Sequence, residues 1–151
     1  MTICSKILPL LLLSVLLSAF SNSNQSNQRD YPYRTFLGCT EMDMQMLSKK
    51  TFDSLIALPL CAKDTGNRYF KVQSFDILYA ERGLYQDSAG LPIIFTDYTN
   101  IRCDSNVVPK AWVNIFNQRS YRGDTVYIEN VKVLGSDNKS HEGKGLKIII
   151  Q

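Results

Sequence analysis

The fold of this chain is indicated by two stretches of sequence, YFKVQSFDILYA at residues 69–80 and TVYIENVKVL at residues 125–134. In both, apolar and polar residues alternate as on a β-strand that buries one face. The alternation slips by one residue at Gln73–Ser74 and again at Asn130, which is typical of a β-bulge. Two long bulged strands that change face midway predict a mainly β domain, and we expect an antiparallel β-sandwich of the immunoglobulin-like type.

Shorter alternating segments predict two more strands, at residues 91–95 and 146–150. Gly83 is expected to end the first long strand in a turn. Residues 135–138, GSDN, are expected to form a hairpin loop between the last two strands.

One or two short helices accompany these strands. Apolar residues at helical spacing predict one helix between Asp104 and Gln118. Pro109 suits its first turn, and Ser105 or Asn106 can cap it. A second, weaker helical pattern covers residues 48–56, SKKTFDSLI, with Phe52, Leu55 and Ile56 facing inward.

The first 21 residues have the pattern of a secretory signal peptide. Lys6 precedes an apolar run of about 14 residues, shorter than the roughly 20 that span a bilayer. Because Ala19 and Ser21 are small, we expect cleavage after Ser21 and a periplasmic or secreted protein; an uncleaved inner-membrane anchor is the alternative. Polar composition favours a flexible linker at residues 22–38, and residues 39–151 are expected to form one domain.

Export would permit disulfides, and the mature chain keeps three cysteines, Cys39, Cys61 and Cys103. An odd number allows at most one intramolecular bridge, and the sequence does not choose among the three pairings. The remaining thiol could be buried or could link two chains as a covalent homodimer. Three buried thiols without any bridge are the other interpretation.

Composition argues against several classes of function. The 151-residue chain has 44% hydrophobic and 21% charged residues, as in ordinary globular proteins, which argues against disorder. Outside residues 1–21, the 17 basic side chains less Lys6 and the 14 acidic ones leave a net charge of +2. So small an excess gives no reason to expect nucleic-acid binding.

No catalytic, metal-binding or cofactor-binding motif is apparent in the sequence. A nucleophile–base pair and a histidine-based metal site would both need His141, the one histidine, which lies among glycines and charges. We therefore expect a protein that is not an enzyme and uses no cofactor. The tripeptide Arg122-Gly123-Asp124, which some adhesion receptors recognise, is interpreted as a charged turn before a strand.

Three segments of the C-terminal part resemble one known family. They are FKVQSFDILYAERG (70–83), RGDTVYIENVKVLGSDNK (122–139) and GLKIII (145–150); upstream, LSKKTFDSLIAL (47–58) is similar to the segment before the family's first long strand. Together they resemble the C-terminal domain of the gliding-motility and type IX secretion protein GldM. The resemblance covers roughly residues 47–151 and is specific around residues 122–135.

The resemblance implies a non-catalytic periplasmic β-domain. The residues that match the family motif are Arg122, Gly123, Asp124, Tyr127, Glu129 and Gly135. For these the resemblance implies structural roles, with the glycines in turns and Tyr127 and Glu129 in the long strand. The family's glycine pair before the first strand is missing, and Pro59, Leu60 and Cys61 stand in its place. The family protein has several domains in series, so we expect an accessory or diverged relative.

We therefore expect an exported, non-catalytic interaction or structural module. Its partner would be a protein of the cell envelope, and cleavage of the leader would leave no stable membrane anchor. The alternative is a secreted or surface β-domain that binds a glycan or peptide through tyrosines such as Tyr69, Tyr79 and Tyr127.

Overall fold

The computed structural model describes residues 31–41 and 45–151, and residues 31–151 form one compact unit. The predicted signal peptide and residues 22–30 of the predicted linker lie outside the described residues. Strands make up 52% of the structure, together with two short helices, so the prediction of a mainly β domain is confirmed. Neither of the helices in this part of the chain is long and apolar enough to span a bilayer.

The described elements follow in the order β1 (Tyr33–Leu37), β2 (Met46–Leu47), α1 (Lys49–Ile56), β3 (Leu60–Asp64), β4 (Tyr69–Gln86), β5 (Pro92–Cys103), α2 (Lys110–Arg119), β6 (Thr125–Leu134), β7 (Ser140–Glu142) and β8 (Leu146–Ile150). The strands form one sheet in the order β1-β3-β4-β6-β8-β2, with β5 beside β4 and β7 beside β6. Neighbouring strands are antiparallel except β2 and β8, which are parallel.

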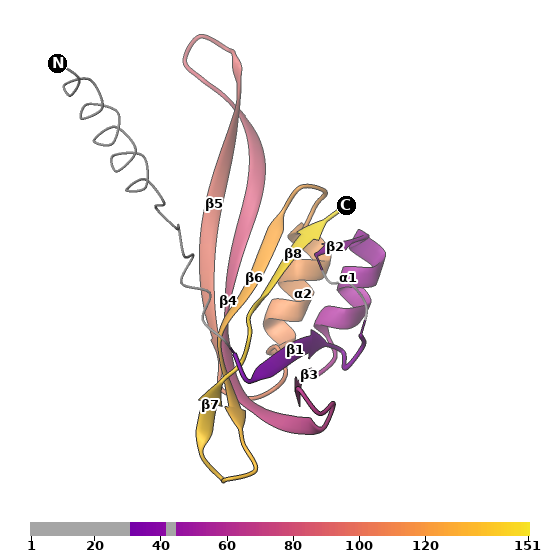
Figure 1. The fold of residues 1–151 in the computed structure, drawn as a ribbon. Coiled ribbons are helices and arrows are strands. Elements are labelled where there is room, and N and C mark those ends of the chain that lie inside the picture. Colours follow the sequence, from indigo (N-terminus) through magenta and orange to yellow (C-terminus); the bar gives the residue numbers. More distant parts are fainter. Residues whose placement is uncertain (1–30, 42–44) are drawn as a thin grey trace, which may run out of the picture. The chain divides into compact units, whose positions relative to one another are not determined.

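The sheet curls into an open half-barrel (Figure 1). The expected sandwich of two facing sheets is not confirmed, because two helices supply the second layer. Phe52 of α1 and Phe116 of α2 meet edge to face with ring centroids 5.8 Å apart, and Phe116 meets Tyr79 of β4 at 5.2 Å. All three side chains are buried, so the core lies between the helices and one face of the sheet.

The two long strands contain the bulges that the sequence predicts. The register between β4 and β6 shifts on both sides of Ser74. On β6, Asn130 takes a φ of +50°, a left-handed conformation that asparagine tolerates better than most residues. Val126 before the bulge and Val131 after it are both buried, because the extra residue restores the inward face.

The hairpin formed by β4 and β5 is longer than predicted. Gly83 does not end the first strand, because β4 continues to Gln86 and the turn follows it. The ring of Tyr85 lies over Gly83, where a Cβ would be 2.5 Å from the Tyr85 ring. β5 in turn extends to Cys103, well beyond the predicted strand at residues 91–95.

The predicted turn at residues 135–138 is present. The Gly135 N–H donates to the Lys139 carbonyl at 2.9 Å, and Asn138 has a φ of +58°. The strand that follows is β7, which pairs with β6, so β7 lies between this turn and the last strand, β8.

Both predicted helices are present. The hydroxyl of Ser48 accepts a hydrogen bond from the Thr51 N–H at the start of α1, whose buried residues are those predicted. α2 begins directly after Pro109 and has no side-chain cap. The expectation of a cap by Ser105 or Asn106 is wrong, because the Ser105 hydroxyl instead bonds within its own turn, to the backbone of Val107.

The folded domain begins before residue 39. β1 lies within the segment 22–38 that was expected to be a flexible linker, and it pairs antiparallel with β3 along its whole length. Tyr33, Thr35 and Leu37 are buried, because alternate side chains of this strand face the core.

Candidate functional site

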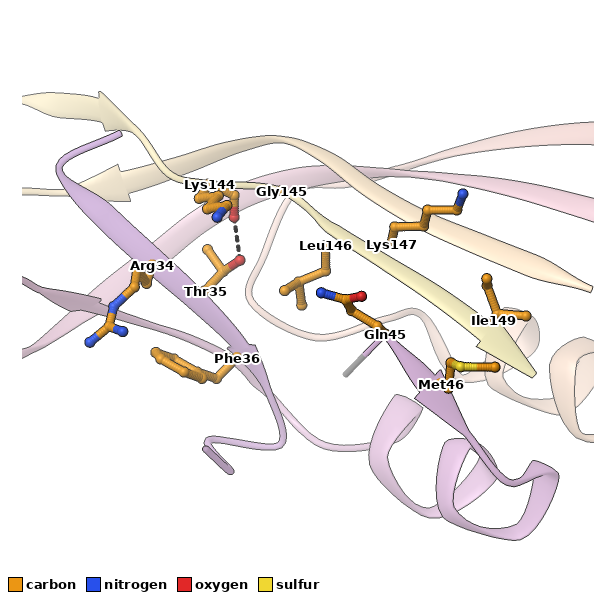
Figure 2. Close-up of a pocket in the computed structure, with 10 residues that line it drawn as sticks. All are labelled: Arg34, Thr35, Phe36, Gln45, Met46, Lys144, Gly145, Leu146, Lys147 and Ile149. Carbon is orange, nitrogen blue, oxygen red and sulfur yellow. Dashed lines mark hydrogen bonds between the residues drawn. The ribbon is translucent and has the colours of Figure 1, made fainter. Parts of the chain in front are cut away.

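The sheet ends at β1 on one side and at β2, which pairs with β8, on the other; a groove of about 610 Å³ lies between β1 and these two strands. We call it the β1–β8 groove. Its lining, shown in Figure 2, consists of Arg34, Thr35, Phe36, Gln45, Met46, Lys144, Gly145, Leu146, Lys147 and Ile149.

Hydrogen bonds close the narrow end of the groove. The Lys144 N–H donates to the Tyr33 carbonyl at 2.8 Å, and the Thr35 hydroxyl donates to the Lys144 carbonyl (Figure 2). Gly145 allows the chain to pass here, because a Cβ at this position would lie 2.5 Å from the Ile128 carbonyl oxygen. The groove therefore has a fixed end, held by main-chain geometry.

Beyond this point the two strands diverge, because each continues to pair with a different neighbour. β1 stays with β3, whereas β8 pairs with β6 and takes β2 on its other side. The Ile149 N–H donates to the Gln45 carbonyl at 2.9 Å. The described residues thus place no strand between β1 and β2.

The edge of β1 is largely closed on the groove side. In an antiparallel strand the N–H and C=O of alternate residues point to the same side. Since the Tyr33 carbonyl faces Lys144, the backbone amide and carbonyl of Thr35 point to that side as well, but Thr35 is only 4% exposed. The groove therefore offers side chains rather than an open strand edge.

The lining combines cations with an apolar surface. Arg34, Lys144 and Lys147 line the groove, and none of the ten lining residues in the described part of the chain is a carboxylate. The Arg34 guanidinium lies 6.0 Å from the centre of the Phe36 ring. In Figure 2 these two side chains come from β1, and Leu146 and Ile149 come from the opposite strand. The groove is therefore suited to an extended segment with both apolar and acidic side chains.

A neutralised lysine lies beside the groove. Lys63 forms an ion pair with Glu41, and its ammonium lies 4.4 Å above the Tyr69 ring and 5.9 Å from the Phe36 ring. The hydrogen bond and charge of Lys63 hold the pKa of Glu41 below its usual value, and the same contact raises the pKa of Lys63. The positive charge of the groove thus comes from its own three cations.

Comparisons with protein-family models, with curated proteins and with solved structures find no match for this chain. The function of the groove is therefore inferred from its geometry and chemistry.

The predicted motif residue Asp124 lies in the core, away from the groove. Its carboxylate is fully buried and accepts hydrogen bonds from the Tyr79 hydroxyl at 2.7 Å and from the N–H groups of Arg82 and Tyr121 at 2.8 Å. Gly123, with a φ of +97°, donates its N–H to the Ile150 carbonyl. A carboxylate held in this way is not exposed for an adhesion receptor.

The other motif residues occupy the turn before β6 and β6 itself. Arg122 is exposed in the turn, and Glu129 is exposed on β6. Tyr127 is half-buried, with the Lys147 ammonium 5.6 Å from its ring centre. Gly135 is buried at the end of the strand. The structure brings none of these residues together as a site.

Of the three cysteines, Cys39 and Cys61 form a disulfide with Cα atoms 5.1 Å apart. The bridge ties the end of β1 to β3, close to the wide end of the groove. Cys103 is free and only 1% exposed. Its burial keeps the sulfur away from other chains, so a covalent homodimer through this thiol would require the core to open.

The remaining polar candidates lie apart from one another. His141 is in β7, and its Nε2 lies 2.9 Å from the Asp137 carboxylate in the hairpin turn. Tyr79 is buried, whereas Tyr69 is exposed beneath the Lys63 ammonium. Among residues 31–41 and 45–151, no three His, Cys, Asp or Glu side chains gather as a potential metal site.

The groove is not apparent from the sequence. Arg34 and Phe36 lie within the expected linker at residues 22–38, and no sequence motif includes Lys144 and Lys147. A signal was present in YRTFL, residues 33–37, where apolar and polar residues alternate as on a strand.

Proposed function

We propose that this protein is an exported, non-catalytic interaction module whose β1–β8 groove binds an extended, acidic segment of a partner protein in the cell envelope. The observation that carries the proposal is the groove itself: three cations beside an apolar surface, with no carboxylate among the described residues that line it. Contact with the apolar lining would supply affinity, and the cations would select acidic side chains.

The disulfide supports export. Disulfides persist in oxidising compartments and are rare in the cytosol of most cells. The Cys39–Cys61 bridge also holds β1, one wall of the groove, against β3. The signal-peptide pattern of residues 1–21 also favours export.

We also propose that the module is accessory to, or diverged from, the type IX secretion and gliding machinery. This part of the proposal depends on the resemblance to the C-terminal domain of GldM. The buried carboxylate of Asp124 and the left-handed turn at Gly123 support the structural roles that the resemblance implies for the motif.

A charge-reversal experiment tests the groove. The purified protein is presented to an array of ten-residue peptides that includes alternating apolar and acidic sequences. We expect the double variant Arg34→Glu/Lys147→Glu to bind selected peptides about tenfold more weakly or worse, because two attractive contacts become repulsive. Equal affinity of wild type and variant would show that the groove is not the binding site.

Lys71→Glu/Lys110→Glu is the matched control, because it makes the same change of charge at exposed lysines of β4 and α2. Its affinity should stay within about twofold of wild type at moderate salt, where distant surface charges are screened. An equal loss in this variant would assign the effect to net charge rather than to the groove.

Crosslinking in envelope fractions tests the link to the machinery. Recovery of a secretion or gliding component that depends on Arg34 and Lys147 is the expected result. Recovery of unrelated proteins would reject the relationship to GldM while leaving peptide binding intact.

The alternative is a surface domain that binds a glycan or a peptide through tyrosines. The structure gives little support to glycan binding. Tyr79 is buried, and Tyr69 and Tyr127 each lie beneath a lysine ammonium. Saturable binding on a glycan array that the groove variant retains would favour this alternative.

A further inference from the structure

Lys63 is the one cation of the described residues that is almost fully buried. Only 6% of its surface is exposed, although lysine is rarely buried to this degree unless it is paired. Arg34 of β1 and Tyr69 of β4 are its partners in the two flanking strands, so the three side chains lie in a row on one face of the sheet. Because Tyr33 and Thr35 face the core, this row lies on the opposite face.

Two aromatic rings enclose the Lys63 ammonium. It lies 4.4 Å from the centre of the Tyr69 ring and 5.9 Å from the centre of the Phe36 ring. A cation at such distances from an aromatic face is attracted by the ring. Since all three residues belong to paired strands, the sheet itself positions the ammonium.

The carboxylate that pairs with this ammonium is held less firmly. Glu41 belongs to no helix or strand, and its side chain is 63% exposed. An exposed side chain gains little from being fixed in one ion pair. An almost buried ammonium without a counter-charge is unfavourable, however. The position beside Lys63 therefore requires a carboxylate, and a carboxylate from another chain would satisfy it as well as Glu41 does.

This ion pair adjoins the β1–β8 groove. Phe36 lines the groove, and its ring lies near both the Lys63 ammonium and, at 6.0 Å, the Arg34 guanidinium. The hydrogen bond and charge of Lys63 lower the pKa of Glu41, and the charge of Arg34 lowers it further. Glu41 thus lies in the field of a groove cation, and an acidic segment that crosses Phe36 brings its own carboxylate to the same place.

We propose that Lys63, with the rings of Phe36 and Tyr69, is a carboxylate subsite at the margin of the β1–β8 groove. Glu41 occupies this subsite in the free protein, and an aspartate or glutamate of the bound segment displaces it. The inference rests on the proposed function and adds to it a specificity residue, Lys63, and an internal competitor, Glu41. Segments without a carboxylate that reaches Lys63 leave Glu41 in place and bind more weakly.

Zero-length crosslinking tests the exchange of partners. A water-soluble carbodiimide joins a lysine amine to a carboxylate in direct contact as an amide, and the water that is lost converts the carbodiimide to its urea. The free protein should give a link between Lys63 and Glu41 on peptide mapping. A saturating amount of an acetylated ten-residue peptide of alternating leucine and aspartate should replace this link with one between Lys63 and a peptide aspartate.

Affinities of the same peptide test the competition. Glu41→Gln should bind it about fivefold more tightly than wild type, because the internal competitor is gone. Adding Lys63→Met should cancel this gain. The double variant leaves no buried charge unpaired, so its circular dichroism spectrum should match wild type. A peptide of alternating leucine and asparagine should bind wild type and Glu41→Gln equally.

The matched controls are Asp87→Asn and Lys110→Met, which make the same two changes of charge elsewhere. Asp87 lies in the turn between β4 and β5, far from β1 (Figure 1), and an asparagine oxygen can still accept the hydrogen bonds that its carboxylate accepts within the turn. Lys110 is exposed at the start of α2. Each control should bind within about twofold of wild type at moderate salt.

Two results would overturn the subsite while leaving the groove as the binding site. One is a bound leucine–aspartate peptide with Lys63 still linked to Glu41, which would make Glu41 a permanent structural partner. The other is an equal gain in Asp87→Asn, which would assign the effect to net charge. Absence of binding to wild type and to every variant would reject the proposed function and the subsite together.

Discussion

The carboxylate of Asp124 connects β4 to the turn before β6. It accepts three hydrogen bonds, two from backbone N–H groups and one from the Tyr79 hydroxyl, and has no exposure to solvent. Removing one partner from such a buried group lowers the stability of the fold, because the remaining donors or acceptors are then left unsatisfied.

We predict that Asp124→Ala lowers the free energy of unfolding by about 3 kcal/mol, whereas Tyr79→Phe, which removes one donor, lowers it by about 1 kcal/mol. Urea unfolding followed by the fluorescence of Trp112 measures both. If Asp124→Ala were as stable as wild type to within about 0.5 kcal/mol, the buried carboxylate would not have the structural role assigned to it.

Cys103 is a second residue whose chemistry follows from burial. Burial raises the pKa of its thiol from 9.0 to about 11, so the thiol stays protonated at neutral pH. Because the folded state holds this proton more tightly than the unfolded state, the associated stability is complete below about pH 9 and is lost as the pH rises toward 11.

We predict that alkylation near pH 8 leaves Cys103 unmodified in the native protein and modifies it in concentrated urea, as read by peptide mapping. Ser88→Cys, at an exposed position in the hairpin turn, is the positive control and should react at once. Native labelling of Cys103 at a rate similar to that in urea would show that the thiol is accessible.

At the scale of elements, the disulfide adds a covalent link to the pairing of β1 with β3. The strand has only five residues, and Arg34 and Phe36 on it line the groove. The bridge between Cys39 and Cys61 spans 22 residues of sequence, which in the chain-entropy model corresponds to about 3 kcal/mol.

We predict that Cys39→Ala/Cys61→Ala lowers the free energy of unfolding by about 3 kcal/mol and weakens peptide binding by the groove. Thermal unfolding with and without reductant measures the first effect. Reductant should destabilise wild type and leave the double variant unchanged. Equal sensitivity of both proteins would place the effect elsewhere.

The elements that could be predicted are those that a short, continuous sequence pattern specifies. The bulges at Ser74 and Asn130 follow from slips in the alternation, and α1 follows from Ser48 and the spacing of its apolar residues. β1 could not be separated from the linker, because five alternating residues are too few to outweigh the polar segment before them. The full length of the β4–β5 hairpin could not be predicted, because Gly83 resembles a turn signal but packs beneath Tyr85 within β4.

At the scale of the whole molecule, sequence periodicity did not distinguish a sandwich from a half-barrel. It indicates that one face of each strand is buried, but not whether a sheet or a helix covers it. The groove was equally out of reach, because its walls, Thr35 and Lys144, are 109 residues apart in sequence. Which strand edges remain unpaired is a property of the complete topology.

The separation of 109 residues between Thr35 and Lys144 affects the order in which the domain can fold. β1 makes contacts with Lys144, and β2 pairs with β8. These early strands therefore cannot complete their contacts until the C-terminal residues are present. Non-local pairing of this kind folds slowly and leaves intermediates exposed. A ribosome or a translocon releasing this domain from its N-terminus would therefore hold a largely unfolded chain until residues 144–150 emerge, which is the state that export machinery and holding chaperones recognise.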